Sequence, residues 1–222
     1  MILRVWEKVK EALNDVYIAT DHQEIYDLAK NAGASVLMTT SHLGSGTERV
    51  AEAASQIFAG NDSTNQIIIN IQGDEPLITT KAIIELCRAF HNKNVDIATL
   101  VHRAVDLAAL QNPNRPKVVI DQDRNAMYFS RASIPSVSIP SVSLDRTPAY
   151  LHIGIYGFRY SVLQEIIRLS PTPLEIAERL EQLRWLENGY SIRCIETEYN
   201  GFGIDTPEDL DRLNKRLKEN QP

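Results

Sequence analysis

The sequence predicts an α/β domain in which helices cover both faces of a mainly parallel sheet. Short apolar, β-branched segments alternate with amphipathic segments through the first half of the chain, which is the pattern of strands joined by helices. The clearest apolar segment runs from Ile67 to Ile71 and is typical of a buried parallel strand. At 222 residues the chain is long enough for one such domain with a sizeable core.

The first half of the chain is expected to alternate helix and strand in a regular order. Apolar residues at helical spacing predict helices over 2–13, 48–58 and about 80–91, and a short helix after Asp21 that ends at Gly33. Runs of β-branched residues predict strands at 16–20, 35–39, 67–71 and 95–101. Gly73 and Pro76 end the third of these strands in a tight turn.

The second half departs from this regular alternation. Segments 117–121 and 126–130 flank a polar turn and predict a β-hairpin, followed by a loop in which Ser-Ile-Pro-Ser-Val occurs twice within 133–142. We expect a strand at 150–158, helices at 160–169 and 174–187, and a last strand at 191–196. Gly189 ends the second helix, and Thr206 and Pro207 open the final one as N-cap and first residue.

Composition argues against several classes of function. The net charge of −6 argues against a nucleic-acid backbone as the main partner. No apolar run approaches the ~20 residues of a membrane span, and no signal peptide is recognisable. Cys87 and Cys194 are far apart and lack metal-binding spacing, so we expect two reduced, buried thiols in a cytosolic protein. The five histidines form no ligand cluster, which argues against a zinc site.

Acidic residues stand at positions that suit a magnesium ion. Asp74 and Glu75 follow the buried strand at its carboxyl end, the edge of an open α/β sheet where ligands bind. In phosphate chemistry Mg²⁺ takes one or two carboxylates plus substrate phosphates, and Asp205, just before the final helix, could converge with Asp74 on one ion. A solvated turn at Asp74 and a purely capping role for Asp205 are the alternatives that the residues leave open.

Other polar segments could bind an anionic ligand or could have structural roles alone. Ser45-Gly46-Thr47 offers hydroxyl and N–H groups near a helix N-terminus, which suits a nucleotide, although glycine-serine loops are common. Arg131 follows a strand, and its planar guanidinium could bind a carboxylate or phosphate. His152 inside a strand is more often a structural residue, and Glu181-Gln182 in the middle of a helix would usually face solvent.

Several segments together resemble one enzyme family, the 3-deoxy-manno-octulosonate cytidylyltransferases, also called CMP-Kdo synthetases. The resemblance runs in order from the first residue to the last helix, and the combination is specific although each piece alone is modest. The matching segments are Tyr17-Ile18-Ala19-Thr20-Asp21, Ser45-Gly46-Thr47-Glu48-Arg49, Asn70-Ile71-Gln72-Gly73-Asp74-Glu75-Pro76, Met127-Tyr128-Phe129-Ser130-Arg131-Ala132, His152-Ile153-Gly154-Ile155-Tyr156-Gly157-Phe158-Arg159, Leu180-Glu181-Gln182-Leu183-Arg184 and Gly203-Ile204-Asp205-Thr206-Pro207-Glu208-Asp209-Leu210.

The resemblance implies a Rossmann-like nucleotidyltransferase fold, with residues 1–222 as a single domain. Members of the family transfer CMP from CTP to the acidic sugar Kdo and release pyrophosphate, using Mg²⁺, in the cytoplasm of bacteria that build lipopolysaccharide. The implied roles are metal binding and catalysis for Asp74 and Asp205, CTP binding for Ser45, Gly46 and Asp74, and Kdo binding for Gln72, Arg131, His152, Tyr156, Glu181 and Gln182. We also expect a homodimer formed through the inserted hairpin and loop of residues 115–150, and no nucleic-acid or membrane partner.

One departure from the family pattern concerns the start of the chain. The family begins with a strand and a glycine-rich basic loop that holds the CTP triphosphate, whereas Met1 to Val5 match the helix that follows this loop. We therefore expect that on the order of 25 residues of the pattern are absent, and an inactive fragment is one alternative function. The other alternative is a cytidylyltransferase for a different acidic sugar, such as sialic acid. The segments 152–156 and 181–184 argue against it.

Overall fold

The computed structural model describes residues 1–59, 65–136, 148–201, 203, 204, 206, 208–211, 213 and 215. The helices are α1 (Ile2–Lys10), α2 (Gln23–Asn31), α3 (Gly46–Phe58), α4 (Thr80–Arg88) with a 3₁₀ turn at Ala89–His91, α5 (Leu107–Gln111), α6 (Tyr160–Ile166), α7 (Pro173–Glu178) and α8 (Gln182–Glu187). The strands are β1 (Tyr17–Thr20), β2 (Ser35–Met38), β3 (Ile67–Asn70), β4 (Ile97–Arg103), β5 (Lys117–Ile120), β6 (Ala126–Ser130), β7 (Tyr150–Arg159) and β8 (Ile192–Glu196). The α/β class expected from the sequence is confirmed.

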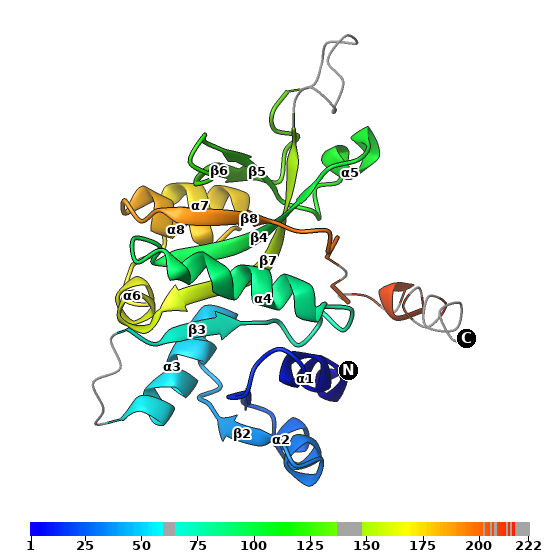
Figure 1. Cartoon of the computed structure of the whole chain (residues 1–222), viewed down its shortest axis with the longest axis vertical. Coiled ribbons are helices and arrows are strands. Elements are labelled where there is room, and N and C mark those ends of the chain that lie inside the picture. Colours follow the sequence, from blue (N-terminus) through cyan, green and yellow to red (C-terminus); the bar gives the residue numbers. More distant parts are fainter. Residues whose placement is uncertain are drawn as a thin grey trace.

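The strands form a six-stranded mixed sheet and a separate two-stranded sheet (Figure 1). In the larger sheet β7 is the longest strand and pairs antiparallel with β3, β4 and β5, while β4 pairs parallel with β8. Strands β1 and β2 pair parallel with each other. The sheet contains more antiparallel pairs than the regular alternation suggested. Parallel pairing needs a crossover, usually a helix, whereas β7 follows the β5–β6 hairpin, which reverses the chain.

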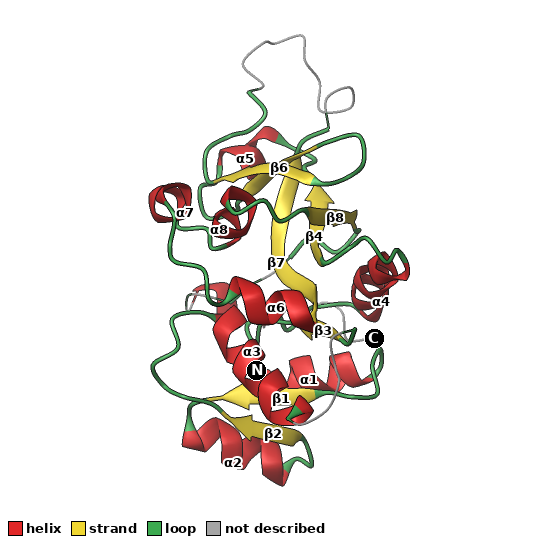
Figure 2. Ribbon diagram, turned by 90° about the vertical axis from the view of Figure 1, so that its left-hand side faces the viewer, coloured by secondary structure: helices red, strands yellow, loops and turns green. Residues whose placement is uncertain are grey.

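Helices cover both faces of the larger sheet, as predicted, and each face has its own apolar core (Figure 2). On one face α4 packs against β4 and β7, and the core there includes Leu86, Leu100 and Ile155, all with 0% exposure. On the other face α3 packs against β3, α6 against β7 and α8 against β6, around a core that includes Phe158 and Trp185. Because an apolar core packs against each face of the sheet, β7 is held rigidly, and the side chains at its two ends keep fixed positions.

The helix predicted over 174–187 is two helices, α7 and α8. At the start of α7 the Thr172 N–H donates to the Glu175 carboxylate at 3.2 Å, and Arg179 ends the helix in the left-handed conformation, with φ of 54°. That conformation is uncommon for a residue other than glycine, so the sequence carries no signal for the break. As a consequence, Glu181 stands at the N-terminal end of α8 and not in the middle of a helix.

Most other local expectations are confirmed within one or two residues. The hairpin forms at β5–β6, and Gly33 and Gly189 have φ of 83° and 84° at the ends of α2 and α8. Thr206 Oγ1 accepts a hydrogen bond from the Asp209 N–H at the start of the final helix, as expected for an N-cap. Helix α5, which follows the end of β4, was not predicted. Within the described part of the chain, no helix is long and apolar enough to cross a membrane.

Candidate functional site

The candidate site begins where three neighbouring strands carry polar side chains on one face. Asn70, the last residue of β3, lies opposite Tyr156 of β7, and Tyr156 lies opposite Thr99 of β4. Residues directly opposite each other in an antiparallel pair project to the same side of the sheet. The sheet therefore presents a row of polar groups on the face that α3 and α8 cover.

The N-terminus of α3 lies against the end of β3. Ser45 is the N-cap of α3, and its Oγ accepts a hydrogen bond of 3.2 Å from the Glu48 N–H. Gly46 leaves room for its neighbour, because a Cβ atom there would lie 3.1 Å from the side-chain nitrogen of Gln72. The glycine therefore permits this close approach, and the structure brings the predicted residues Ser45, Gly46 and Gln72 together.

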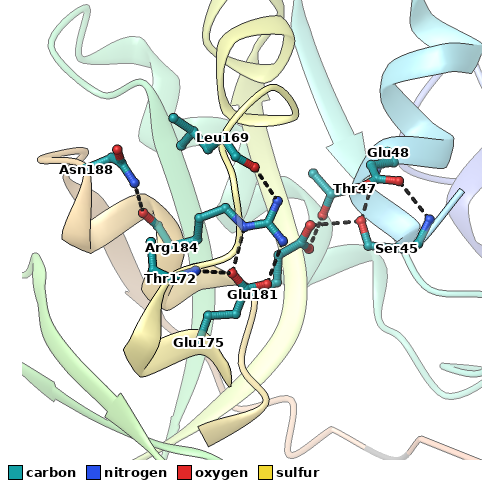
Figure 3. A network of polar contacts seen from close by, with 10 residues as sticks. Ser45, Thr47, Glu48, Leu169, Thr172, Glu175, Glu181, Arg184 and Asn188 are labelled. Carbon is teal, nitrogen blue, oxygen red and sulfur yellow. Dashed lines mark hydrogen bonds and ion pairs between the residues drawn. The ribbon is translucent and has the colours of Figure 1, made fainter. Parts of the chain in front are cut away.

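Glu181, at the start of α8, connects the two helices through its carboxylate. Its oxygens accept hydrogen bonds from Ser45 Oγ at 2.8 Å and from Thr47 Oγ1 at 2.6 Å (Figure 3). Burial raises the pKa of Glu181, and the hydrogen bonds from Thr47 and Ser45 oppose that rise because they favour the charged form. The carboxylate is thus held at a defined position between α3 and α8.

Arg184 fixes α8 against the preceding helix. Its guanidinium donates to both carboxylate oxygens of Glu175, at 2.7 and 2.6 Å, and to the carbonyl of Leu169 at 2.8 Å (Figure 3). This bidentate ion pair is the geometry in which arginine binds carboxylates most strongly. Arg184 was quoted in the family resemblance without a role, and the structure indicates that it supports the position of Glu181.

His152 of β7 is a neutral, hydrogen-bonded residue in the structure. Burial lowers the pKa of His152 to about 3. Its Nε2 lies 3.0 Å from Thr99 Oγ1, which in turn donates to the carbonyl of Ile155 at 2.9 Å. Since the threonine hydroxyl has a single proton, we assign the proton of the imidazole to Nε2, which leaves Nδ1 as an acceptor. His152 can therefore orient a polar ligand but does not supply a positive charge.

Three side chains at the site are more than nine-tenths buried and each has an atom without a hydrogen-bond partner among the described residues. The atoms are Asn70 Nδ2, Tyr156 Oη and Gln182 Nε2. Burial raises the pKa of Tyr156 far above its usual range, and the nearby charge of Glu181 raises it further, so the hydroxyl keeps its proton. Buried donors without partners are rare in native proteins, and a polar ligand would satisfy them.

Asn70 is the residue of this group that the sequence analysis missed. It directly follows three isoleucines in the strand, and its only available signal was a polar side chain at the end of an apolar run. Tyr156 and Gln182 were predicted from the family resemblance. Tyr156 is part of the row of polar groups, and Gln182 lies on α8 together with Trp185, whose ring centroid is 5.1 Å from that of Tyr156.

Arg131 lies apart from this group, at the base of the hairpin. Its guanidinium donates to the carbonyls of Glu178 at 2.9 Å, Arg179 at 3.3 Å and Pro113 at 3.2 Å. These bonds use three of the five N–H donors of an arginine and tie the hairpin to the end of α7. A role for Arg131 in ligand binding stays a prediction.

Of the two proposed metal ligands, Asp74 follows β3 in the chain and Asp205 follows β8. The backbone carbonyl of Asp74 accepts a hydrogen bond of 3.0 Å from the Ile204 N–H, so the segment that leads to position 205 runs beside the turn after β3. Asp205 itself lies outside the described residues. Glu75 is 9% exposed, and its carboxylate accepts a hydrogen bond from the Tyr199 hydroxyl. Within the described residues, no group of three or more His, Cys, Asp and Glu side chains could hold a metal ion.

Comparison with known proteins places the chain in a family. Residues 1–193 match the family model described as cytidylyltransferase. The chain is 45% identical over 218 residues to a 3-deoxy-manno-octulosonate cytidylyltransferase of Parabacteroides distasonis, covering 96% of this chain and 85% of the relative. A protein of the same name from Solibacter usitatus is 44% identical over 98% of this chain and 84% of its own length.

Solved structures agree with this result. A CMP:2-keto-3-deoxy-manno-octonic acid synthetase complexed with CTP has a TM-score of 0.88 and 30% identity, over 99% of this chain and 88% of that one. A glucose-1-phosphate thymidylyltransferase from Bacillus anthracis, with a TM-score of 0.64 and 19% identity, shares the fold. The chain belongs to the 3-deoxy-manno-octulosonate cytidylyltransferase family.

Proposed function

We propose that this protein transfers CMP from CTP to Kdo, giving CMP-Kdo and pyrophosphate. The observation that carries the proposal is the near full-length match to proteins named for this activity, at 45% identity over 96% of the chain. The structural relative with a TM-score of 0.88 was solved with CTP, which supports CTP as the nucleotide. Such a product would serve the synthesis of lipopolysaccharide, and we propose a cytoplasmic location.

In this proposal the two substrates meet where α3 approaches β3. Ser45 and Gly46 bind the cytidine part of CTP, while Gln72, which lies against Gly46, contacts the sugar. The other residues proposed for the sugar are Arg131, His152, Tyr156, Glu181 and Gln182. A sugar acid rich in hydroxyl groups suits this surface, because each hydroxyl can accept from the unpartnered donors of Tyr156 and Gln182.

The chemistry requires orientation more than covalent participation by the protein. The anomeric hydroxyl of Kdo attacks the α-phosphorus of CTP, a new oxygen–phosphorus bond forms, and the bond to the departing pyrophosphate breaks. Glu181 and Gln182 hold the sugar and Ser45 and Gly46 hold the nucleotide, so that the attacking oxygen lies in line with the leaving group. Neutral His152 accepts a hydrogen bond from the sugar through Nδ1 and keeps it in this orientation.

The carboxylates proposed for Mg²⁺ have suitable chemistry. Asp74 and Asp205 would supply hard oxygen ligands, and one or two carboxylates are enough because substrate phosphates complete the coordination. When bound there, Mg²⁺ supplies positive charge against the phosphates and the leaving pyrophosphate.

We further propose that the chain acts as a homodimer, and that the inserted segment 115–150 forms the contact. The β5–β6 hairpin stands at one end of the larger sheet, away from β1 and β2 (Figure 1). In this proposal the hairpin contacts a second copy and leaves the candidate site free. Sedimentation of the chain with and without residues 132–148 would test the contact.

Pyrophosphate release tests the proposed activity directly. The assay supplies CTP, Kdo and Mg²⁺ to the 222-residue chain and, in parallel, to a version extended upstream of Met1. We expect release that depends on both CTP and Kdo and that sialic acid does not support. Release with sialic acid in place of Kdo, or none with Kdo in either version, would overturn the proposal.

A further inference from the structure

Thr47 makes a contact for which the proposed reaction gives no role. It is the second residue of α3 and is 4% exposed, and its hydroxyl donates to Glu181 Oε2 at 2.6 Å. Ser45 Oγ donates to the other carboxylate oxygen at 2.8 Å. The two hydroxyls thus bind one carboxylate that lies 136 and 134 residues later in the chain, at the start of α8. Figure 3 shows both hydrogen bonds.

The charged groups around Glu181 are engaged elsewhere. Arg184, on the same helix, binds Glu175 through two nitrogens and the Leu169 carbonyl through the third. On α3 the carboxylate of Glu48 accepts from the Gly44 N–H at 2.7 Å, and on β7 Tyr156 keeps its proton. Within the described part of the chain, the side chains that donate hydrogen bonds to Glu181 are therefore the two hydroxyls.

We propose that Thr47 is a positioning residue for sugar recognition, because its hydroxyl fixes the Glu181 carboxylate in the orientation that binds Kdo. The inference rests on the proposed function. An ionised carboxylate has about four acceptor sites, so each oxygen that receives a hydroxyl keeps one for the sugar. Ser45 alone would hold one oxygen and leave the carboxylate free to rotate about its last bond, whereas two donors on opposite oxygens fix its plane.

The first test needs no turnover and compares Thr47→Val with Thr47→Ser. Valine has nearly the shape of threonine without the hydroxyl, and serine keeps the hydroxyl without the methyl group. The readout is the titration of Glu181 in ligand-free protein, followed by ¹³C NMR of labelled glutamate with the signal assigned through Glu181→Gln. Hydrogen bonds favour the charged form, so we expect the pKa of Glu181 to be higher in the valine variant than in the wild type, and unchanged in the serine variant.

The second test measures the dissociation constants of Kdo and of CTP separately by calorimetry. We expect Thr47→Val to weaken Kdo binding about tenfold, the loss expected for one hydrogen bond to a charged group, with CTP binding changed less than twofold. Thr47→Ser should restore Kdo binding. In a Glu181→Gln background the valine substitution should add little, because the interaction through which it acts is already lost.

The outcomes separate the inference from the proposed function. If Thr47→Val leaves both the Glu181 pKa and the Kdo affinity at wild-type values, or if serine fails to restore them, Thr47 does not position Glu181 and the inference is overturned. If the wild-type chain binds no Kdo while the Glu181 pKa still rises in the valine variant, the proposed function fails and the positioning of Glu181 by Thr47 stands.

Discussion

Polar groups gather at both ends of β7, and the two gatherings differ in how completely they are hydrogen-bonded. At the start of β7 lies the hairpin cluster, which consists of Lys117, Tyr128, Ser130, Arg131 and Glu178. Glu178 accepts from Ser130 Oγ at 2.6 Å, from the Arg131 N–H at 2.8 Å and from the Tyr128 hydroxyl at 3.3 Å. Lys117, with 0% exposure, donates to the carbonyls of Asn112 and Arg131.

Near the other end of β7 lies the site cluster, which consists of Asn70, Tyr156 and Gln182. Each of its side chains is at most 7% exposed and has a buried atom without a partner among the described residues, whereas the equally buried Lys117 and Ser130 of the hairpin cluster have no such atom. An unsatisfied buried polar group costs free energy, and a protein keeps such groups where a ligand completes them. We therefore interpret the hairpin cluster as structural and the site cluster as prepared for substrate, and each prediction below tests that difference.

The largest expected effect is a loss of activity at the site end of the molecule. Asp74→Asn keeps the shape of the side chain but removes its charge, so we expect normal folding and a fall in turnover of several orders of magnitude. Each tenfold fall in rate corresponds to a loss of about 1.4 kcal/mol of transition-state stabilisation. Initial rates of pyrophosphate release and thermal melting would be measured together. Asp123→Asn, in the exposed turn of the hairpin, is the matched control. Near-normal turnover of Asp74→Asn with Mg²⁺ present would remove Asp74 from the site.

A smaller effect is expected at His152, between the two clusters. With a pKa of about 3 the imidazole is neutral from pH 5 to 8, so His152→Ala should raise KM for Kdo about tenfold at every pH in that range, and KM for CTP much less. The folded state resists protonation, so wild-type stability should fall as pH drops from about 6.5 toward 3. In His152→Gln this part of the pH dependence should be absent. A rise in KM for CTP alone would place His152 on the nucleotide side.

The next prediction concerns the stability that the hairpin cluster provides. Burial by itself would raise the pKa of Glu178, but the hydrogen bonds from Arg131, Ser130 and Tyr128 outweigh it and leave the pKa lowered. Glu178→Ala leaves these donors without an acceptor and should reduce the free energy of unfolding by about 1–2 kcal/mol at pH 7. A lowered pKa means that the stabilisation is present above about pH 4.3 and is lost as pH falls through the folded value. Urea unfolding at pH 7 and pH 3.5 would show it, and an equal difference at both values would contradict the role of the charge.

Much of the fold could be predicted because its signals are local. Alternating apolar periodicity located the strands and helices, and Gly33, Gly189 and Thr206 marked helix ends through their own backbone or capping chemistry. The direction of β7 and the break between α7 and α8 depend on tertiary contacts. Arg179, which ends α7, has a left-handed backbone conformation, and its carbonyl accepts a hydrogen bond from Arg131. Arg131 is far from Arg179 in the sequence, so no local pattern predicts this bond.

The site residues could be predicted only where they lie in segments that resemble the family. Ser45, Gly46, Gln72 and Glu181 were predicted in this way, and the structure brings them together. Asn70 and Thr47 also belong to these segments, but the order of residues does not reveal their contacts. It does not show that the Asn70 amide has no partner among the described residues, or that the Thr47 hydroxyl binds Glu181. Such roles follow from strand register and helix packing, which the sequence does not display.

The smallest expected effect is the sharpest test of the difference between the clusters, because it concerns the sign of a stability change. Asn70 and Ser130 are 3% and 2% exposed, but Asn70 Nδ2 has no partner among the described residues, while Ser130 Oγ donates to Glu178. Asn70→Leu removes an unsatisfied donor and only a long contact of 3.5 Å with Gln72, so ligand-free protein should unfold at equal or higher free energy, by up to about 1 kcal/mol.

Ser130→Ala is the matched control, since it removes a satisfied donor and should destabilise the protein by about 1 kcal/mol. Thermal melting with and without Kdo adds a second readout, because a ligand that binds only the folded state raises the melting temperature, and a ligand that binds more tightly raises it more. The rise caused by Kdo should shrink in Asn70→Leu and persist in Ser130→Ala. If Asn70→Leu destabilised the ligand-free chain as much as Ser130→Ala does, the Asn70 amide would already be satisfied within the protein. The polar groups at the two ends of β7 would then be equally well hydrogen-bonded, and the site cluster would not be prepared for a ligand.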